Sequence, residues 1–188
     1  MNGRKTVYLY YTAIATPLLL WMILNPPAEA LSNGDIVGWM TIWMAGSIIA
    51  AAVFTFLTNR GKPNEYLLAA GIALTGSLFI TVSNGAVGIM GSEDNPENLI
   101  YSAMLIGALV TLGICRFEAK KLSRAMYLLA AGFAFLAIIA LAGMLVDESQ
   151  AEFSRLAVYM AIHTVFVFTF ALPGYLFNLS EKKILTNP

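Results

Sequence analysis

Six apolar stretches, each about as long as a bilayer is thick, leave this chain few folds to adopt. A helix rises about 1.5 Å per residue, so about 20 apolar residues cross the roughly 30 Å of hydrocarbon in a bilayer. No stretch shows the short polar–apolar alternation of a barrel strand, and an open sheet cannot satisfy its backbone in lipid. We therefore expect an all-α integral membrane bundle of six transmembrane helices, in a single domain over residues 1–188. The expected spans are Val7–Leu24, Ile36–Thr58, Tyr66–Met90, Leu99–Cys115, Ala125–Val146 and Leu156–Phe177.

The composition agrees with a chain embedded in the lipid bilayer and excludes several other classes. Apolar residues make up 59% of the chain and charged residues only 12%, against roughly 25% charged in a soluble domain. The 11 basic and 11 acidic residues cancel, and no basic patch has interleaved aromatic residues, so we expect no nucleic-acid partner. Cys115 is the only cysteine, which excludes an internal disulfide and a thiolate metal cluster within one chain.

The charges between the apolar stretches predict the orientation of the helices. The loops on one side hold ten of the 11 Lys and Arg residues, and the opposite loops are mainly acidic, with Arg155 as the basic exception. By the positive-inside rule the basic side faces the cytoplasm. We therefore expect a bacterial inner-membrane protein with both termini in the cytoplasm. Aromatic residues near the span ends are interpreted as interfacial anchors, among them Tyr66, Tyr101, Tyr127, Tyr159 and Tyr175.

The first apolar stretch has a second interpretation. Arg4 and Lys5, the apolar run and the segment Ala28-Glu29-Ala30 together imitate a signal peptide with a small-residue cleavage site. Cleavage would leave five spans. The run of 18 residues, from 7 to 24, exceeds the usual 7–15 of a signal sequence, so we favour a retained helix.

The turn after the third span carries a run of regularly spaced glycines. From Asn84 to Tyr101 the sequence reads NGAVGIMGSEDNPENLIY, with Gly85, Gly88 and Gly91 at every third position. In lipid, such small residues let a neighbouring helix backbone approach closely. We therefore expect this glycine face to contact another helix.

The same stretch resembles one found in an uncharacterised bacterial family of small multi-pass inner-membrane proteins, with the pattern NxAVGIxGSExNPxNLxY. The resemblance covers about 18 residues. It implies the multi-pass architecture and no particular chemistry. The matching positions are Asn84, Ala86, Val87, Gly88, Ile89, Gly91, Ser92, Glu93, Asn95, Pro96, Asn98, Leu99 and Tyr101.

The few polar groups within the spans define a candidate site. No Asp, Glu, Lys or Arg lies in the middle of a span, which argues against an ion pump. Asn84 and His163 both lie roughly 10–12 Å below their outer helix ends at 1.5 Å per residue. An outward-facing pocket is one interpretation, and interhelical hydrogen bonds, worth about 0.6 kcal/mol each, are the other. The candidate ligand-binding residues are Asn84, His163, Glu93, Asp94, Thr41 and Ser102.

Enzyme motifs are missing from the sequence. One histidine cannot supply paired axial ligands to a b-type haem, and no nucleophile elbow or metalloprotease helix groups the reactive residues. We therefore expect no catalytic residue, metal site or cofactor, with a membrane enzyme using His163 as a less favoured class. The favoured hypothesis is binding or translocation of a small solute or lipid through an outward-facing pocket. The alternative is a structural or accessory subunit of a larger membrane complex or homo-oligomer.

Overall fold

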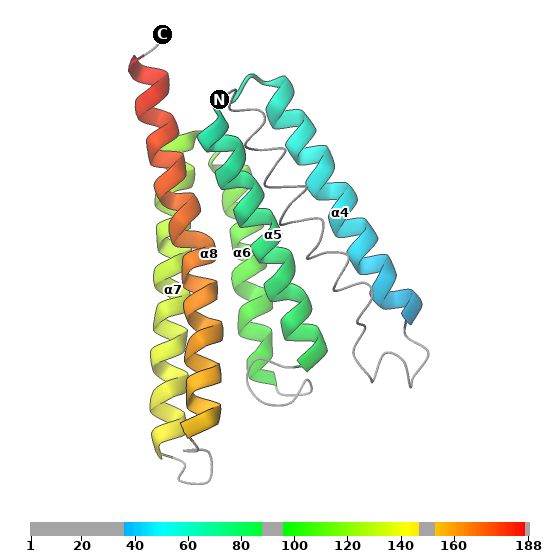
Figure 1. Cartoon of the computed structure of the whole chain (residues 1–188), viewed down its shortest axis with the longest axis vertical. Helices are drawn as coiled ribbons and strands as arrows, with labels where there is room; N and C mark the ends of the chain where they lie inside the picture. The colour runs from blue at the N-terminus through cyan, green and yellow to red at the C-terminus, as the bar shows by residue number, and fades with distance from the viewer. Residues whose placement is uncertain (1–35, 88–95, 147–152, 187–188) are drawn as a thin grey trace.

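The computed structural model describes residues 36–87, 96–146 and 153–186, which form helices joined by short turns. No strand occurs among these residues, so the predicted all-α class is confirmed for the described part of the chain. Figure 1 shows the long helices arranged side by side. They are α4 (Ile36–Asn59), α5 (Asn64–Val87), the short 3-10 helix η2 (Pro96–Asn98), α6 (Leu99–Ile114), α7 (Ala119–Val146) and α8 (Phe153–Thr186).

The helix bounds follow the apolar stretches closely at some ends and overrun them at others. The span predicted at Val7–Leu24 lies outside the described residues, while α4 and α6 begin where the apolar stretches begin. In contrast, α7 starts at Ala119 rather than Ala125, and α8 continues past Phe177 to Thr186. The added turns are mostly polar, and an ion pair between Lys120 and Glu181, at 3.6 Å, connects them. An apolar stretch predicts the length embedded in lipid, whereas backbone hydrogen bonds continue the helix beyond it.

Two of the described segments are long and apolar enough to cross a membrane. They are Ala119–Gly143 in α7 and Leu156–Ile184 in α8. The segment Leu99–Ile114 is also apolar but shorter.

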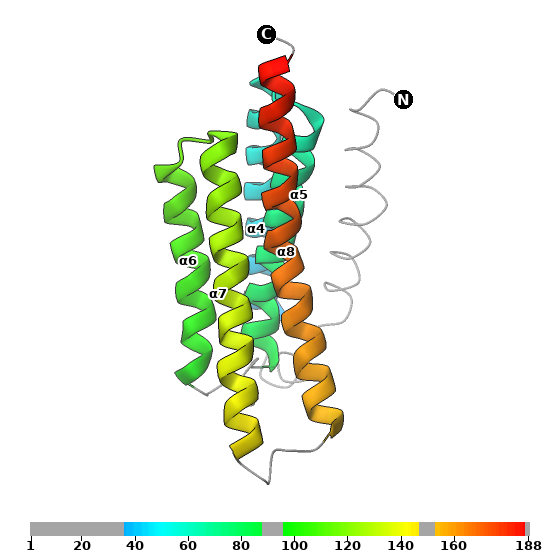
Figure 2. The same ribbon diagram turned by 90° about the vertical axis from the view of Figure 1, so that its left-hand side faces the viewer.

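Helix α8 packs against both α7 and α5, so the third and sixth predicted spans are neighbours. Figures 1 and 2 show α7 and α8 side by side over most of their length, and α4 on the side of α5 away from α7. The contact between α5 and α8 is tight at Gly76, where a Cβ atom would stand only 1.9 Å from Thr169 Cγ2. A side chain at position 76 would therefore force the two helices apart.

Aromatic residues form the centre of the bundle. The rings of Phe133 and Phe170 stack at 5.2 Å with an interplanar angle of 4°. Phe166 stands edge-on to Phe133 at 5.8 Å. All three are at most 1% exposed. Such offset and edge-to-face pairs stabilise a core beyond the burial of their area.

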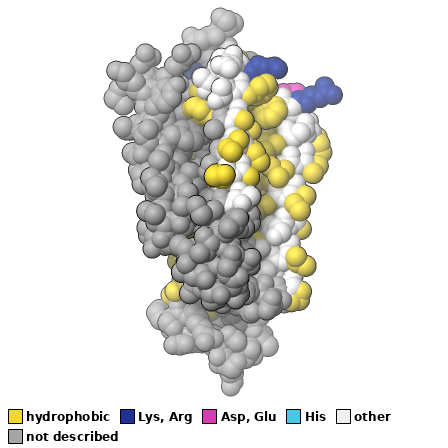
Figure 3. Space-filling view, turned by 90° about the vertical axis from the view of Figure 1, so that its right-hand side faces the viewer, with side chains coloured by type: hydrophobic (Ala, Val, Ile, Leu, Met, Phe, Trp, Pro, Cys, Tyr) yellow, Lys and Arg dark blue, Asp and Glu magenta, His cyan; other side chains and the backbone are white. Residues whose placement is uncertain are grey.

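The outer surface of the helices is also apolar. Leu128, Ile114 and Leu99 are 74%, 71% and 69% exposed. In Figure 3, hydrophobic side chains cover the described part of one face, and Lys and Arg gather at its upper end. We call this upper end the basic end; it brings together the end of α4, the start of α5, the turn between α6 and α7, and the end of α8.

Candidate functional site

Asn84 lies buried near the end of α5 and ties this helix to the start of α6. Its Nδ2 donates hydrogen bonds to the carbonyl oxygen of Asn98, at 3.0 Å, and to Ser102 Oγ, at 3.2 Å. The side chain is only 9% exposed, and its Oδ1 has no hydrogen-bond partner among the described residues. A buried acceptor without a donor costs about 1–3 kcal/mol.

His163 lies in α8 and is bonded through both ring nitrogens. Its Nδ1 is 3.0 Å from the carbonyl oxygen of Tyr159, which can only accept, so Nδ1 carries the proton. In the neutral imidazole, Nε2 then accepts the hydrogen bond from Tyr101 Oη, at 2.6 Å. The Tyr101 and Tyr159 hydroxyl oxygens are 3.5 Å apart. The group thus forms a satisfied polar network around a neutral imidazole, with His163 only 1% exposed.

The structure brings Asn84 and His163 to neighbouring residues of α6 but not to each other. Asn84 bonds Ser102, and His163 bonds Tyr101. Among the described residues, no hydrogen bond joins Asn84 to His163. Two separate interhelical connections, one from α5 and one from α8, therefore converge on the first turn of α6.

The other residues selected from the sequence are only partly placed. Thr41 is exposed on α4, and Ser102 is the bonding partner of Asn84. Glu93, Asp94, Gly88 and Gly91 lie outside the described residues, as do the surroundings of Gly85 within α5. The contact of the glycine face with another helix stays a prediction.

Three tyrosines interpreted as interfacial anchors are instead buried. Tyr66, Tyr101 and Tyr159 are 0%, 0% and 5% exposed, because each hydroxyl finds a partner inside the bundle; that of Tyr66 donates to the Phe117 carbonyl at 2.9 Å. Tyr127 and Tyr175 do remain exposed. The spacing of Tyr159 four residues before His163 puts both on one helix face, a signal that predicts their contact; the link to Tyr101 depends on tertiary packing.

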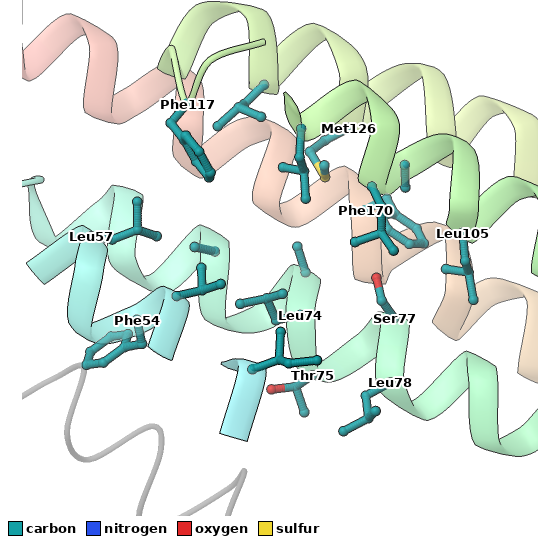
Figure 4. Close-up of a pocket in the computed structure, with 18 of the residues that line it drawn as sticks. Phe54, Leu57, Leu74, Thr75, Ser77, Leu78, Leu105, Phe117, Met126 and Phe170 are labelled. Atoms are coloured by element: carbon teal, nitrogen blue, oxygen red, sulfur yellow. The ribbon is translucent and has the colours of Figure 1, made fainter. Parts of the chain in front are cut away.

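A cavity of about 470 Å³ opens between α4, α5 and α6. Figure 4 shows Leu74 and Leu78 of α5 and Leu105 of α6 around it, with Met126 and Phe170 contributed by α7 and α8. The volume is that of a small-molecule pocket. Its wall includes a few hydroxyl groups and is otherwise apolar; the hydroxyl groups belong to Thr55, Tyr66, Thr75, Ser77 and Thr81.

The cavity arises where small residues face one another across the helices. Ala70 and Ala73 of α5 and Ala108 of α6 line it, and their short side chains leave the space unfilled. None of the six candidate ligand-binding residues is among the lining residues. Apolar side chains, mainly from α4, α5 and α6, therefore form a second candidate site, distinct from the polar groups chosen from the sequence.

One end of the cavity reaches the basic end of the bundle, at Leu57, Tyr66 and Phe117. Phe117 follows α6 in a turn where Arg116 and Phe117 take the left-handed conformation, with φ 47° and 58°. This conformation is disfavoured by roughly 1–2 kcal/mol per residue. It is held by the Phe117 carbonyl, which accepts hydrogen bonds from Tyr66 Oη and, at 3.4 Å, from Lys62 Nζ.

Metal-binding side chains do not gather in the described part of the chain. Within residues 36–87, 96–146 and 153–186, no three His, Cys, Asp or Glu side chains are placed to hold a metal ion. The candidate sites are thus a polar network at the start of α6 and an apolar cavity beside it. Comparison with known proteins finds no family model, no curated protein and no solved structure that matches this chain.

Proposed function

We propose that this chain is a multi-pass protein of the bacterial inner membrane that binds a lipid, or a similarly apolar small molecule, in the cavity between α4, α5 and α6. In this proposal the chain forms a six-helix bundle with both termini in the cytoplasm. The observation that carries the function is the apolar cavity of about 470 Å³.

The surface of the described helices supports a membrane location. Leu128, Ile138 and Phe168 are among many large apolar side chains that are more than 60% exposed. Each such side chain would gain about 1.5–3 kcal/mol by leaving water, and soluble monomers rarely expose contiguous apolar surface on this scale. This exposed apolar surface is therefore suited to contact with lipid.

The orientation can be tested by cysteine labelling on a Cys115→Ala background. The positive-inside rule places Lys120 in the cytoplasm and Asp94 outside. A membrane-impermeant thiol reagent applied to intact spheroplasts should therefore label a cysteine at position 94 and leave one at position 120 unlabelled. The reverse pattern would show that the topology is inverted.

The chemistry of the cavity wall supports an apolar ligand over a hydrophilic one. No charged side chain lines the cavity, and a polar solute that enters without hydrogen-bond partners loses at least 1–3 kcal/mol per unpaired group. An empty apolar cavity of this size also gives water few partners. A hydrocarbon chain fills the space without either cost.

Binding can be tested with a cavity-filling variant and a matched surface variant. The protein is purified in a mild detergent, and bound lipid is quantified by native mass spectrometry. Ala108→Leu adds its side chain into the cavity, whereas Ala131 is exposed on α7 and Ala131→Leu adds the same volume outside it. Ala108→Leu should displace the lipid and Ala131→Leu should keep it. Equal lipid content in both variants, or no lipid in the unsubstituted protein, would contradict the proposal.

A role as an accessory subunit is the second candidate, and one observation favours it. Gly107 and Gly113 of α6 have open space where a Cβ would stand, and Ala103 is exposed one turn before Gly107. Small residues four apart on a lipid-facing helix allow a partner helix to approach closely. Gly107→Leu should then release a co-purifying membrane partner or dissociate an oligomer. If the mass of the native particle is unchanged, this role loses its support.

A further inference from the structure

Resting on the proposed lipid-binding function, we propose that the ligand is an anionic phospholipid of the cytoplasmic leaflet. One acyl chain lies in the cavity between α4, α5 and α6. The phosphate is bound at the basic end by Arg60, Lys62 and Arg116, which we call the phosphate cluster.

The phosphate cluster is organised around Phe117, at the end of the cavity. Lys62 Nζ is 3.4 Å from the Phe117 carbonyl oxygen and 4.8 Å from the centre of the Tyr66 ring. The Arg60 guanidinium lies 4.8 Å over the Phe56 ring, whose centre is 5.9 Å from that of Phe117. Arg116 precedes Phe117 in the chain. Phe117 and Tyr66 both line the cavity, so these cations lie next to one end of it.

The cations of the phosphate cluster differ from Lys120, Lys121 and Lys183 at the same end, because no carboxylate of the described residues pairs with them. Lys120 pairs with Glu181 at 3.6 Å, Lys121 with Glu118 at 2.8 Å and Lys183 with Glu65 at 2.5 Å. None of the three cluster residues has an ion pair with a carboxylate in the described part of the chain. Among the described residues, the positive charge is thus uncompensated at this end of the cavity.

Charge and cavity together select the kind of lipid. Arg60 and Arg116 are exposed, and Lys62 is half-buried, so all three can meet a headgroup at the membrane surface. Arg and Lys bind phosphate oxygens through charge-assisted hydrogen bonds. Phosphatidylcholine carries its own cation, whereas a phospholipid such as phosphatidylglycerol leaves its phosphate charge free. Anionic lipids are also those that the cytoplasmic surface concentrates near basic residues.

The test compares two lipids and two charge variants of the full chain. Protein in nanodiscs of phosphatidylcholine with a minor fraction of phosphatidylglycerol is released into detergent, and the bound lipid is identified by native mass spectrometry. The cluster variant combines Arg60→Gln, Lys62→Gln and Arg116→Gln. The matched variant removes three paired cations at the same end, by Lys120→Gln, Lys121→Gln and Lys183→Gln.

We expect the unsubstituted protein and the matched variant to retain phosphatidylglycerol preferentially. Each neutralised cation near an anionic surface should weaken binding about five-fold, so the cluster variant should lose on the order of 100-fold of the preference. The single variant Lys62→Gln keeps two of the three charges, so its preference for phosphatidylglycerol should fall about five-fold. This variant checks the result if the triple variant misfolds.

The possible failures are distinguishable. If the unsubstituted protein retains both lipids equally, the headgroup inference fails while lipid binding stands; if it retains neither, both fail. Equal loss in the cluster and matched variants would show that only total charge matters, and would overturn the phosphate cluster. If Ala108→Leu leaves the amount of bound phosphatidylglycerol unchanged, the lipid is bound outside the cavity. That result would overturn the proposed arrangement.

Discussion

The contact between α5 and α8 at Gly76 makes a quantitative prediction about packing. A Cβ on residue 76 would stand 1.9 Å from Thr169 Cγ2, and 3.0 Å from both Thr169 Cβ and Thr169 Oγ1. Rotation about χ1 can move Thr169 Cγ2 away, but Thr169 Cβ stays at 3.0 Å, so the helices must also shift by a few tenths of an ångström. Overpacking of this kind costs about 1–3 kcal/mol. Against this, alanine gains about 1 kcal/mol over glycine in a helix.

The matched control is Gly107→Ala, since a Cβ at Gly107 meets nothing within 4 Å. It should keep the gain of about 1 kcal/mol without the packing cost. Gly76→Ala should therefore be less stable than Gly107→Ala by about 1–3 kcal/mol, measured by reversible unfolding in mixed micelles. Thr169→Ala removes Cγ2 and keeps Cβ, so it should partly rescue Gly76→Ala and give a coupled double-mutant cycle. Equal stabilities, or additivity with Thr169→Ala, would refute the close contact between these helices.

Three further predictions use the same unfolding assay. Gly61→Ala should cost about 1 kcal/mol although the position is spacious, because residue 61 has φ +65°; an unchanged midpoint would contradict this. Burial raises the pKa of Glu65, but the hydrogen bond and the charge of Lys183 together lower it by more. The pKa of Glu65 therefore lies below its ordinary value of 4.5. This depressed pKa contributes stability that is present above pH 4.5 and is lost as the pH falls through the folded-state pKa. Glu65→Gln should therefore reduce the dependence of the unfolding free energy on pH. An identical pH profile in the variant would argue against the ion pair between Glu65 and Lys183. Tyr101→Phe removes the hydroxyl that bonds His163 Nε2 and should lower the unfolding free energy by about 1 kcal/mol. The same substitution in a His163→Phe background should cost nothing further.

Much of the helix pattern can be predicted from the sequence because it depends on local chemistry. Apolar runs of sufficient length determine where α4 and α6 begin. The polar extensions of α7 and α8 were not predicted, because hydropathy does not register the ion pair of Lys120 with Glu181. Such pairs form only once the two helices lie side by side.

The sequence does not predict that Tyr66 and Tyr101 are buried. The interfacial interpretation of Tyr66 and Tyr101 rested on their position near span ends, but each hydroxyl has an internal partner, Phe117 O and His163 Nε2 respectively. Those partners are 51 and 62 residues away. No local pattern identifies them, whereas the four-residue spacing of Tyr159 and His163 does.

The cavity could not be predicted because it is formed by residues with no distinctive signal. Ala73 and Ala108 are ordinary residues of membrane helices, and the space between them depends on how α4, α5 and α6 are placed. A search for polar groups in the spans leads instead to Asn84 and His163, whose hydrogen bonds connect helices. Polar residues are conspicuous in an apolar sequence, but unfilled space is a property of the packed structure.

The aromatic centre of the bundle gives a physical reason to favour binding over translocation. From the imidazole of His163, ring contacts run to Phe166 at 5.7 Å, on to Phe133 at 5.8 Å and then to Phe170 at 5.2 Å. Phe170 in turn lines the cavity. A hydrophilic solute moving from the polar network to the cavity would have to displace these buried rings and give up its own hydrogen bonds, at a cost of several kcal/mol. A lipid chain entering from the bilayer meets no such barrier, because it exchanges one apolar environment for another.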